Sequence, residues 1–158
     1  MIIRKATIDD YEGLLEIYAE IDEFHRLNHP ELFIHPEGIS RSIDFIDDLI
    51  NSNDMELFVA EEDSKIIGLA ECFLVKAPDF PIVKKRQWVQ LDNIVVKRDF
   101  KHQNVGSSLL NEVTQWAKSK NSDGIELKVY SFNTNAIRYY TRNGFADLAK
   151  IMFLNLDN

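Results

Sequence analysis

The residues best suited to bind a charged ligand form a loop between a predicted strand and a predicted amphipathic helix. Asn104 and Gly106 tolerate the left-handed turn that such a loop needs, and backbone N–H groups exposed at a helix start attract anions. Cationic or hydroxyl side chains surround them in the sequence: Lys97, Arg98, Lys101, His102, Ser107 and Ser108. In a chain with a formal net charge of −8, this local cluster favours a phosphate-bearing ligand. The other interpretation stays open, because a strand-to-helix turn often needs Asn or Gly simply in order to turn.

Two common nucleotide-binding motifs are absent from this loop. It lacks the GxxxxGK[ST] pattern that holds a nucleoside triphosphate with magnesium. It also lacks GxGxxG, which weakens a dinucleotide interpretation. A nucleotide-phosphate enzyme is therefore disfavoured.

Tyr140, in the pattern Asn133-x-x-Ala136-x-x-x-Tyr140, is the candidate general acid. A phenol with a pKa near ~10 is protonated at neutral pH and can deliver a proton to a thiolate whose conjugate thiol titrates near ~8.5. Its neighbour Tyr139 faces about 100° away on a helix, so one of the two rings can point into a cleft. Considered without that pattern, Tyr140 is better interpreted as a core aromatic on a short helix.

Two carboxylates are candidates for a general base. Glu71 lies within an apolar strand, where an acid is unusual unless it is exposed, paired or functional. Asp92 shares a strand face with Gln90, Ile94 and Val96 if no bulge interrupts the strand. Either acid could instead face solvent or form a salt bridge, and a water chain could also accept the proton.

His25 and His29 have the i, i+4 spacing that can bind a metal on a helix. Pro30 follows at once and no third ligand is evident, so we predict no metal site. We expect His25 to pack on the sheet or, with Phe33, to line a pocket for a substrate. The single Cys72 is predicted to be a small buried hydrophobe, not a nucleophile.

Composition limits the class of protein. At 158 residues and 45% hydrophobic content, the chain is predicted to form one domain over residues 1–158. One cysteine excludes an internal disulfide and fits a reducing compartment. The acidic balance argues against nucleic-acid binding, and no apolar run is long enough for a membrane span. A cytoplasmic protein is the expectation.

The elements that must position these residues alternate between strand and helix patterns. The expected order is β-α-α-β-β-β-α-β-α-β-β, which contains seven strands and four helices. Their predicted ranges are 2–6, 8–25, 39–50, 57–62, 65–76, 88–96, 105–118, 125–130, 134–142, 145–150 and 151–156. Thr7 and Asp10 form a capping-box-like start for the first helix, and Gly144 is expected to end the last one.

Two segments resemble motifs of the GNAT superfamily of N-acyltransferases. The segment from Lys101 to Gly106 is similar to [Q/R]-x-x-G-x-[G/A], the acyl-CoA pyrophosphate loop, with Lys in place of Gln or Arg and Asn in place of the first Gly. Downstream, the pattern N-x-x-A-x-x-x-Y-x-x-x-G-F is matched by Asn133, Ala136, Tyr140, Gly144 and Phe145. Two ordered motifs at the expected separation are more specific than either alone.

The resemblance implies an α/β (α+β) fold with a mixed, mostly antiparallel seven-stranded sheet. That sheet is splayed between strands 4 and 5, is flanked by about four helices and holds the pantetheine of acetyl-CoA in the splay. Backbone groups of the strand pair with the pantetheine amides, and a bulge frees an amide that polarises the thioester. The cofactor-binding residues implied are Ile94, Val95, Val96, Lys101, His102, Gln103, Asn104, Val105, Gly106, Ser107, Ser108, Asn133, Ala136 and Tyr139.

The activity implied is direct transfer of an acetyl group from acetyl-CoA to a primary amine of a small molecule or peptide. His25, Phe33 and Gln90 are the expected acceptor-site residues, and Gln90 stands where some members carry a Glu base. That missing acid and the imperfect loop leave an alternative, a catalytically silent acyl-CoA-binding module for sensing or assembly. Homodimers are common in the family, and an exposed edge strand could supply the contact.

Overall fold

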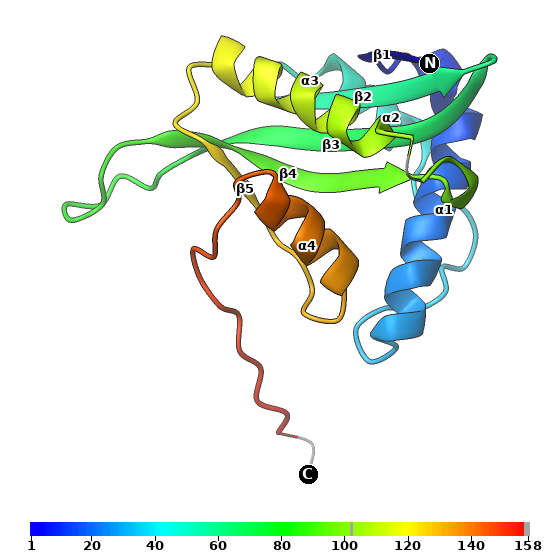
Figure 1. Cartoon of the computed structure of the whole chain (residues 1–158). Helices are drawn as coiled ribbons and strands as arrows, with labels where there is room; N and C mark the ends of the chain where they lie inside the picture. Colours follow the sequence, from blue (N-terminus) through cyan, green and yellow to red (C-terminus); the bar gives the residue numbers. More distant parts are fainter. Residues whose placement is uncertain (102, 157–158) are drawn as a thin grey trace. The chain divides into compact units, whose positions relative to one another are not determined.

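The structure is a computed structural model that describes residues 1–101 and 103–156. It divides into two compact units, Met1–Lys128 and Val129–Asn158, here called unit 1 and unit 2. Unit 1 contains β1 Ile2–Lys5, the 3₁₀ turn η1 Ile8–Asp10, α1 Tyr11–Asn28, α2 Ile43–Asn51, β2 Met55–Glu62, β3 Lys65–Lys76, β4 Gln87–Val96, the 3₁₀ turn η2 Arg98–Phe100, α3 Val105–Ser119 and β5 Ile125–Leu127. Unit 2 contains α4 Thr134–Arg142 and a long extended tail (Figure 1). Within the described ranges, no helix is long and apolar enough to cross a membrane.

The five strands of unit 1 form one mixed sheet in the order β1-β2-β3-β4-β5. Neighbouring strands are antiparallel except β4 and β5, which are parallel. The parallel pairing joins Val89–Leu91 to Ile125–Leu127, so the later part of β4, residues 93–96, pairs with β3 alone within unit 1. Strands 4 and 5 are thus paired over three residues at one end.

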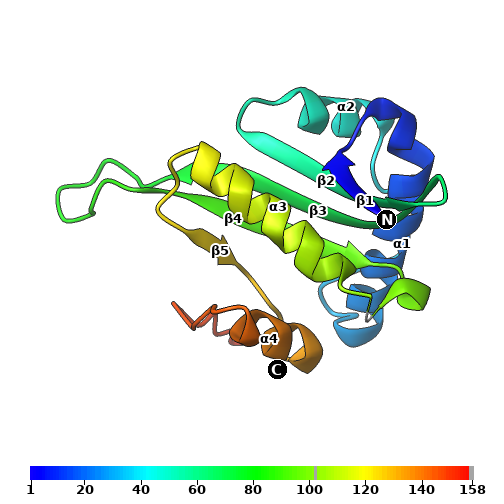
Figure 2. The same cartoon turned by 45° about the horizontal axis from the view of Figure 1, so that its top comes forward.

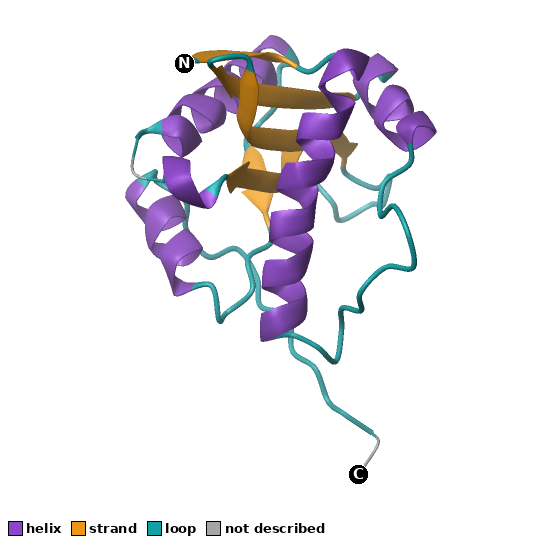
Figure 3. Cartoon of the chain, turned by 90° about the vertical axis from the view of Figure 1, so that its right-hand side faces the viewer, coloured by secondary structure: helices purple, strands orange, loops and turns teal. Residues whose placement is uncertain are grey.

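Helices cover both faces of this sheet (Figures 2 and 3). Helices α1 and α2 pack on one face around a core of buried apolar side chains that includes Leu14, Ile17, Ile46, Leu49, Leu57, Val59, Leu69 and Val95. Helix α3 lies across β2, β3 and β4 on the other face and buries Val105, Leu109 and Val113. The apolar stripe that its three- and four-residue spacing predicted is confirmed.

The helix starts are set by polar side chains. The Thr7 N–H donates to the Asp10 carboxylate at 2.8 Å, which confirms the predicted cap, although one turn of 3₁₀ helix precedes α1. Ser42 caps α2, since its hydroxyl accepts from the Phe45 N–H at 3.2 Å. The prediction that the second helix includes Ile39 was wrong, because that cap starts the helix at Ile43.

A bulge interrupts β4 at Asp92. Glu71 of β3 pairs with Asn93, whereas the next residue, Cys72, pairs with Leu91, which leaves Asp92 without a cross-strand partner. A bulge of this kind reverses the side-chain alternation along the strand. Gln90 therefore shares a face with Glu71 and not with Ile94, so the predicted common face of Gln90, Asp92, Ile94 and Val96 was wrong.

After Leu127 the described residues contain none of the predicted strands. The strand expected over 125–130 ends at Leu127, and residues 145–156, expected to be a hairpin, contain no strand, as Figure 3 shows. A strand requires a neighbouring backbone to pair with, so an apolar composition alone does not determine one. The described residues hold five strands instead of the seven predicted.

Gly68 of β3 lies where α3 approaches the sheet. A Cβ atom on Gly68 would lie 2.9 Å from the Val95 carbonyl oxygen, 3.2 Å from the Leu109 Cδ1 atom and 3.3 Å from a Val105 methyl group. The absence of a side chain at Gly68 therefore sets how closely the first turns of α3 can approach β3 and β4.

Replacing Gly68 with alanine should destabilise unit 1. The added methyl group meets a backbone oxygen that cannot rotate away, and overpacking of this kind costs about 1–3 kcal/mol. Gly124→Ala is the matched control, because nothing lies within 4 Å of the Cβ position there. Urea unfolding compares the variants, and equal midpoints for the two would show that α3 does not need Gly68.

Candidate functional site

The first turn of α3 presents unpaired backbone amides. Asn104, just before the helix, has φ 61°, in the left-handed region that was predicted for it. The first helical hydrogen bond is from the Ser108 N–H to the Asn104 carbonyl, at 3.0 Å. Within the described part of the chain, the N–H groups of the three residues between them, 105–107, therefore have no acceptor. Three such groups at the positive end of a helix of 15 residues can bind an anion.

The side chains around this turn differ in what they can contribute. Val105 is 1% exposed and anchors the helix in the core, so its backbone alone faces the turn. Lys101, Gln103 and Ser107 are exposed, and Gly106 and Ser108 are half-buried. His102, also predicted to bind the cofactor, lies outside the described residues.

Lys97, a cation predicted to lie beside the loop, forms a salt bridge with α1. The Lys97 ammonium pairs with Glu16 of α1 at 2.5 Å, and the Lys97 N–H donates to the Ile67 carbonyl at 2.9 Å. Arg98 and Lys101 are exposed. Among the described residues, Arg98, Lys101 and the helix dipole therefore supply the positive charge near the start of α3.

The second half of β4 offers an edge to a peptide-like ligand. Val95 is buried in the core and Ile94 and Val96 are half-buried, so the side chains of this stretch hold the strand in place. On the side away from β3, residues 92–96 have no strand neighbour in unit 1. Unpaired backbone groups on such an edge can pair with an extended ligand.

Asn93 links the two carboxylates that the sequence singled out. Its side-chain N–H donates to Glu71 Oε2 at 3.0 Å and to Asp92 Oδ2 at 3.0 Å. The Tyr18 hydroxyl of α1 donates to the same Glu71 oxygen at 2.9 Å. The bulge makes this arrangement possible, because it places Asn93, and not Asp92, opposite Glu71.

Glu71 is the buried one of the two acids. It is 6% exposed, and burial raises the pKa of its carboxyl, an effect that the hydrogen bonds from Tyr18 and Asn93 oppose. Both hydrogen bonds end on Oε2, so Oε1 accepts none from the described residues. Asp92 is exposed at the bulge. A buried carboxylate with a raised pKa is better suited to accept a proton near neutral pH.

Arg41 extends this network toward the segment before α2. Its guanidinium lies 3.9 Å from the centre of the Tyr18 ring and donates to Asp22 at 2.6 and 3.1 Å. Sequence reasoning missed the contributions of Tyr18, Asn93 and Arg41. The signal that could have indicated Tyr18 is its place on the buried stripe of α1, because a buried tyrosine hydroxyl needs a partner.

An open hollow of about 610 Å³ lies beside Arg41. Its lining includes Asp22, Phe33, Ile39, Arg41 and Phe45. The His25 ring stacks on Phe33 with centroids 5.1 Å apart, and burial lowers the pKa of His25. Of the three residues predicted to line an acceptor pocket, Phe33 lines the hollow, His25 stacks on Phe33 outside the lining, and Gln90 does not line the hollow. In the parts of the chain that are described, no group of three or more His, Cys, Asp or Glu side chains could hold a metal ion.

Cys72 is buried behind this network. Its thiol lies 3.7 Å from the Glu56 carbonyl oxygen, and burial raises the pKa of Cys72 to about 12. A thiol that stays protonated is a poor nucleophile. The prediction of a small buried hydrophobe is confirmed.

Unit 2 contains the second motif. The Asn133 side-chain oxygen accepts from the Ala136 N–H at 3.2 Å, so this asparagine caps α4. The centroid of the Tyr140 ring lies 5.3 Å from that of the Tyr139 ring and 5.4 Å from that of the Phe145 ring. Burial, and then the neighbouring Tyr139, raise the pKa of Tyr140, which keeps its phenol protonated. Gly144, with φ +88°, ends the helix as predicted.

Known proteins share this fold. An uncharacterised N-acetyltransferase of Methanocaldococcus jannaschii is 26% identical over 145 residues; the match covers 92% of this chain, which spans 60% of the length of that relative. The crystal structure of a Bacillus halodurans protein, solved as a tetramutant, is 25% identical with a TM-score of 0.92 over 99% of this chain and 100% of that one.

A third similar structure is an aminoglycoside N-acetyltransferase in complex with CoA. It is 16% identical and has a TM-score of 0.74, and the match covers 98% of each chain. The model of the Acetyltransferase (GNAT) family matches residues 14–145. That match includes the α3 turn, the Glu71 network and α4. The chain therefore belongs to the GNAT acetyltransferase family.

Proposed function

We propose that this protein is an acetyl-CoA-dependent N-acetyltransferase that transfers the acetyl group directly to a primary amine of a small molecule or peptide. The observation that carries the proposal is the first turn of α3, where a left-handed Asn104 precedes three unpaired amides in a member of the GNAT family. Such a turn fits the pyrophosphate of acetyl-CoA. Acetyl-CoA supplies the acetyl group as a reactive thioester.

The residues present fit the rest of that ligand. The exposed Lys101 side chain and the Ser107 hydroxyl can contact the phosphates. The open edge of β4 at Ile94–Val96 can pair with the two amides of pantetheine. The splay between β4 and β5 that the family pattern implies is consistent with their pairing over three residues. The structurally similar aminoglycoside acetyltransferase was solved with CoA.

Glu71 is the proposed general base. The attacking amine must lose a proton as its nitrogen bonds to the thioester carbon. Glu71 Oε1, which accepts no hydrogen bond from the described residues, can take that proton directly or through one water. Tyr18 and Asn93 hold the other carboxylate oxygen and so fix the direction of Oε1. Asp92 remains the alternative base.

Tyr140 is the proposed general acid. When the carbon–sulfur bond breaks, the departing thiolate takes a proton, and Tyr140 is a phenol that is protonated at neutral pH. In this assignment Tyr139 contacts the cofactor and Asn133 orders the start of α4 through its cap. The protons balance, since the amine loses one to Glu71 and the thiolate gains one from Tyr140.

The hollow beside Arg41 is the proposed acceptor region. It combines an acidic side chain, Asp22, with apolar side chains such as Phe33 and Ile39. A substrate with a cationic amine and an apolar portion would suit this lining, in keeping with a net charge of −8. The acceptor is therefore sought first among amines of this kind.

Gly106→Val should abolish acetyl-CoA binding. A branched side chain on the first turn of α3 would block the approach of a pyrophosphate to the unpaired amides. Isothermal titration of the variant measures the loss, and Gly124→Val is the control at an open site. Wild-type affinity in Gly106→Val, with an unchanged melting temperature, would remove the α3 turn from the binding site.

Glu71→Gln should lower kcat/KM by about 10²–10⁴, because the amide keeps the shape of the carboxylate but cannot accept the proton. In the wild type the base works when deprotonated, so kcat/KM should fall as pH drops through the raised pKa of Glu71. That acidic limb should disappear in the variant. Asp92→Asn is the matched control; if it is inactive while Glu71→Gln is unimpaired, Asp92 is the base.

Tyr140→Phe should lower kcat by about 10² or more with little change in acetyl-CoA affinity, because the variant loses the proton donor and keeps the ring. Tyr139→Phe is the control on the same helix and should retain kcat. Steady-state release of free CoA in the presence of an amine panel gives the rates. An unchanged kcat in Tyr140→Phe would exclude it as the acid, and binding without turnover across the panel would indicate a silent acyl-CoA-binding module.

A further inference from the structure

Three side chains of α1 hold the segment before α2 at one residue, Arg41. Tyr11, Tyr18 and Asp22 lie seven and four residues apart, so they share one face of the helix. The Tyr11 hydroxyl donates to the Arg41 carbonyl at 2.9 Å, and the Arg41 guanidinium donates to Asp22 at 2.6 and 3.1 Å. The same guanidinium lies 3.9 Å from the centre of the Tyr18 ring. Arg41 is therefore held by both its backbone and its side chain.

The guanidinium affects the hydroxyl at the far end of the Tyr18 ring. A cation over an aromatic ring is attracted to the ring face, so it holds the ring in place. Burial and then the Glu71 charge raise the pKa of Tyr18, and the Arg41 charge opposes them. The hydroxyl thus stays protonated, and the nearby cation makes it a stronger donor to Glu71 Oε2, which it contacts at 2.9 Å.

The Arg41 charge also acts on the Glu71 carboxylate. The groups around this carboxylate come from four parts of unit 1: Tyr18 of α1, Leu57 of β2, Asp92 and Asn93 of β4, and Arg41. Burial raises the pKa of Glu71 and the two hydrogen bonds oppose this effect; the charge of Asp92 raises the pKa further and that of Arg41 lowers it. Among the described residues, Arg41 is the cation that favours the ionised form of this buried acid.

We propose that Arg41 is a positioning residue that stabilises the Glu71 carboxylate through Tyr18. This inference rests on the proposed role of Glu71 as the general base. The contribution of Arg41 to proton transfer is indirect, because the guanidinium holds the Tyr18 ring and the Tyr18 hydroxyl holds Glu71 Oε2. Since Arg41 also lines the hollow beside α1, one residue joins the proposed acceptor region to the base.

A purely structural role for Arg41 leads to a different expectation. If Arg41 only fastens the segment before α2 to α1, its loss lowers the melting temperature and leaves the titration of Glu71 unchanged. Two variants separate the two roles. Arg41→Gln removes the charge, whereas Arg41→Lys keeps the charge and loses the paired hydrogen bonds to Asp22.

Carbon-13 NMR of the glutamate carboxyl groups, followed through a pH titration of the full chain, measures the pKa of Glu71 without any substrate. We expect Arg41→Gln to raise this pKa, because the carboxylate loses a nearby positive charge, and Arg41→Lys to restore part of the wild-type value. Glu71→Gln identifies the signal of Glu71.

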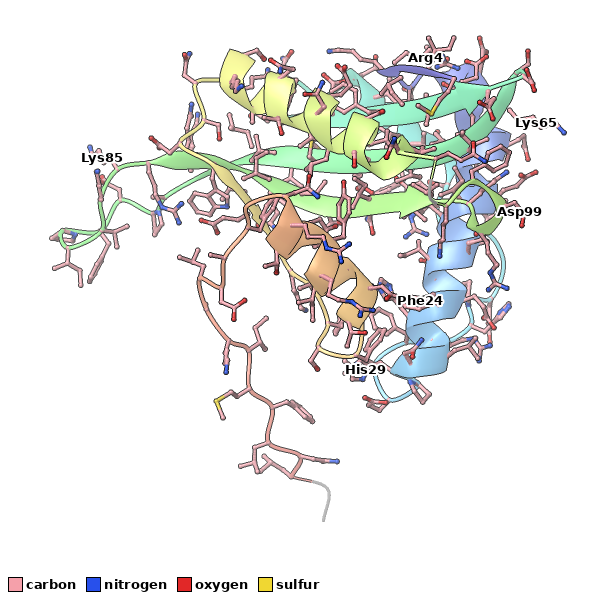
Figure 4. All side chains as sticks on the ribbon, viewed as in Figure 1. Arg4, Phe24, His29, Lys65, Lys85 and Asp99 are labelled. Carbon is pink, nitrogen blue, oxygen red and sulfur yellow. The ribbon has the colours of Figure 1, made fainter. Side chains whose placement is uncertain are left out.

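The matched control is Arg26→Gln. Arg26 is an arginine of α1 that also pairs with a carboxylate, that of Glu23 at 2.6 Å. It lies two residues after Phe24, which Figure 4 labels in the second half of this helix. The same substitution at this exposed ion pair should leave the titration of Glu71 unchanged.

The pH dependence of kcat/KM is the second measurement. A raised Glu71 pKa moves the acidic limb to higher pH, so Arg41→Gln should be slower than the wild type by at least about threefold on that limb, with the smallest difference above it. Tyr18→Phe keeps the ring and removes the hydroxyl. In that background, Arg41→Gln should change the Glu71 pKa less than it does in the wild type.

The other outcomes contradict the inference. An unchanged Glu71 titration in Arg41→Gln would leave Arg41 with a structural role alone. An equal effect with and without the Tyr18 hydroxyl would show that Arg41 does not act through it. A raised Glu71 pKa with an unshifted limb would show that Glu71 is not the base, and Arg41 would then have no part in the reaction. The NMR titration needs no turnover, so it separates a failure of the contact from a failure of the proposed function.

Discussion

The bulge at Asp92 is the constraint on which the rest of unit 1 depends. One extra residue in β4 places Asn93 opposite Glu71 and turns Ile94 and Val96 toward the α3 face. With regular pairing, Asp92 would occupy the place of Asn93, and two carboxylates would face each other across the sheet at a cost in electrostatic repulsion. The bulge inserts an amide between the two acids instead.

The two faces of the sheet then carry different parts of the proposed chemistry. On the α1 face, Tyr18 and Asn93 hold a buried carboxylate and Arg41 connects it to the proposed acceptor region. On the opposite face, the absence of a side chain at Gly68 lets α3 approach closely and present its amides. The second half of β4 lies between the two, with an unpaired edge. Acetyl donor and amine acceptor would meet at that edge.

Local patterns in the sequence predicted much of this arrangement. The apolar spacing of α3, the left-handed Asn104, the cap at Thr7 and the end of α4 at Gly144 all depend on residues close together in the chain. The candidate bases were also found, because an acid within an apolar strand is conspicuous. The bulge was considered in advance, but its position was not predicted, since register depends on pairing with β3.

Long-range contacts account for what the sequence did not reveal. Tyr18 lies 53 residues from Glu71 in the chain, and nothing local indicates that its hydroxyl reaches that carboxylate. Lys97 appeared to belong to the ligand loop but pairs with Glu16 of α1. The apolar composition of residues 145–156 favoured a final hairpin. A strand also depends on pairing with another backbone, which composition does not determine.

Isothermal titration of the full chain with acetyl-CoA, with ATP as the control, tests the central claim most directly. The first turn of α3 predicts binding of one acetyl-CoA per chain and none of ATP, because the loop lacks the GxxxxGK[ST] pattern of a nucleoside triphosphate site. Absence of acetyl-CoA binding, or equal binding of both ligands, would contradict the assignment of the α3 turn as the pyrophosphate site.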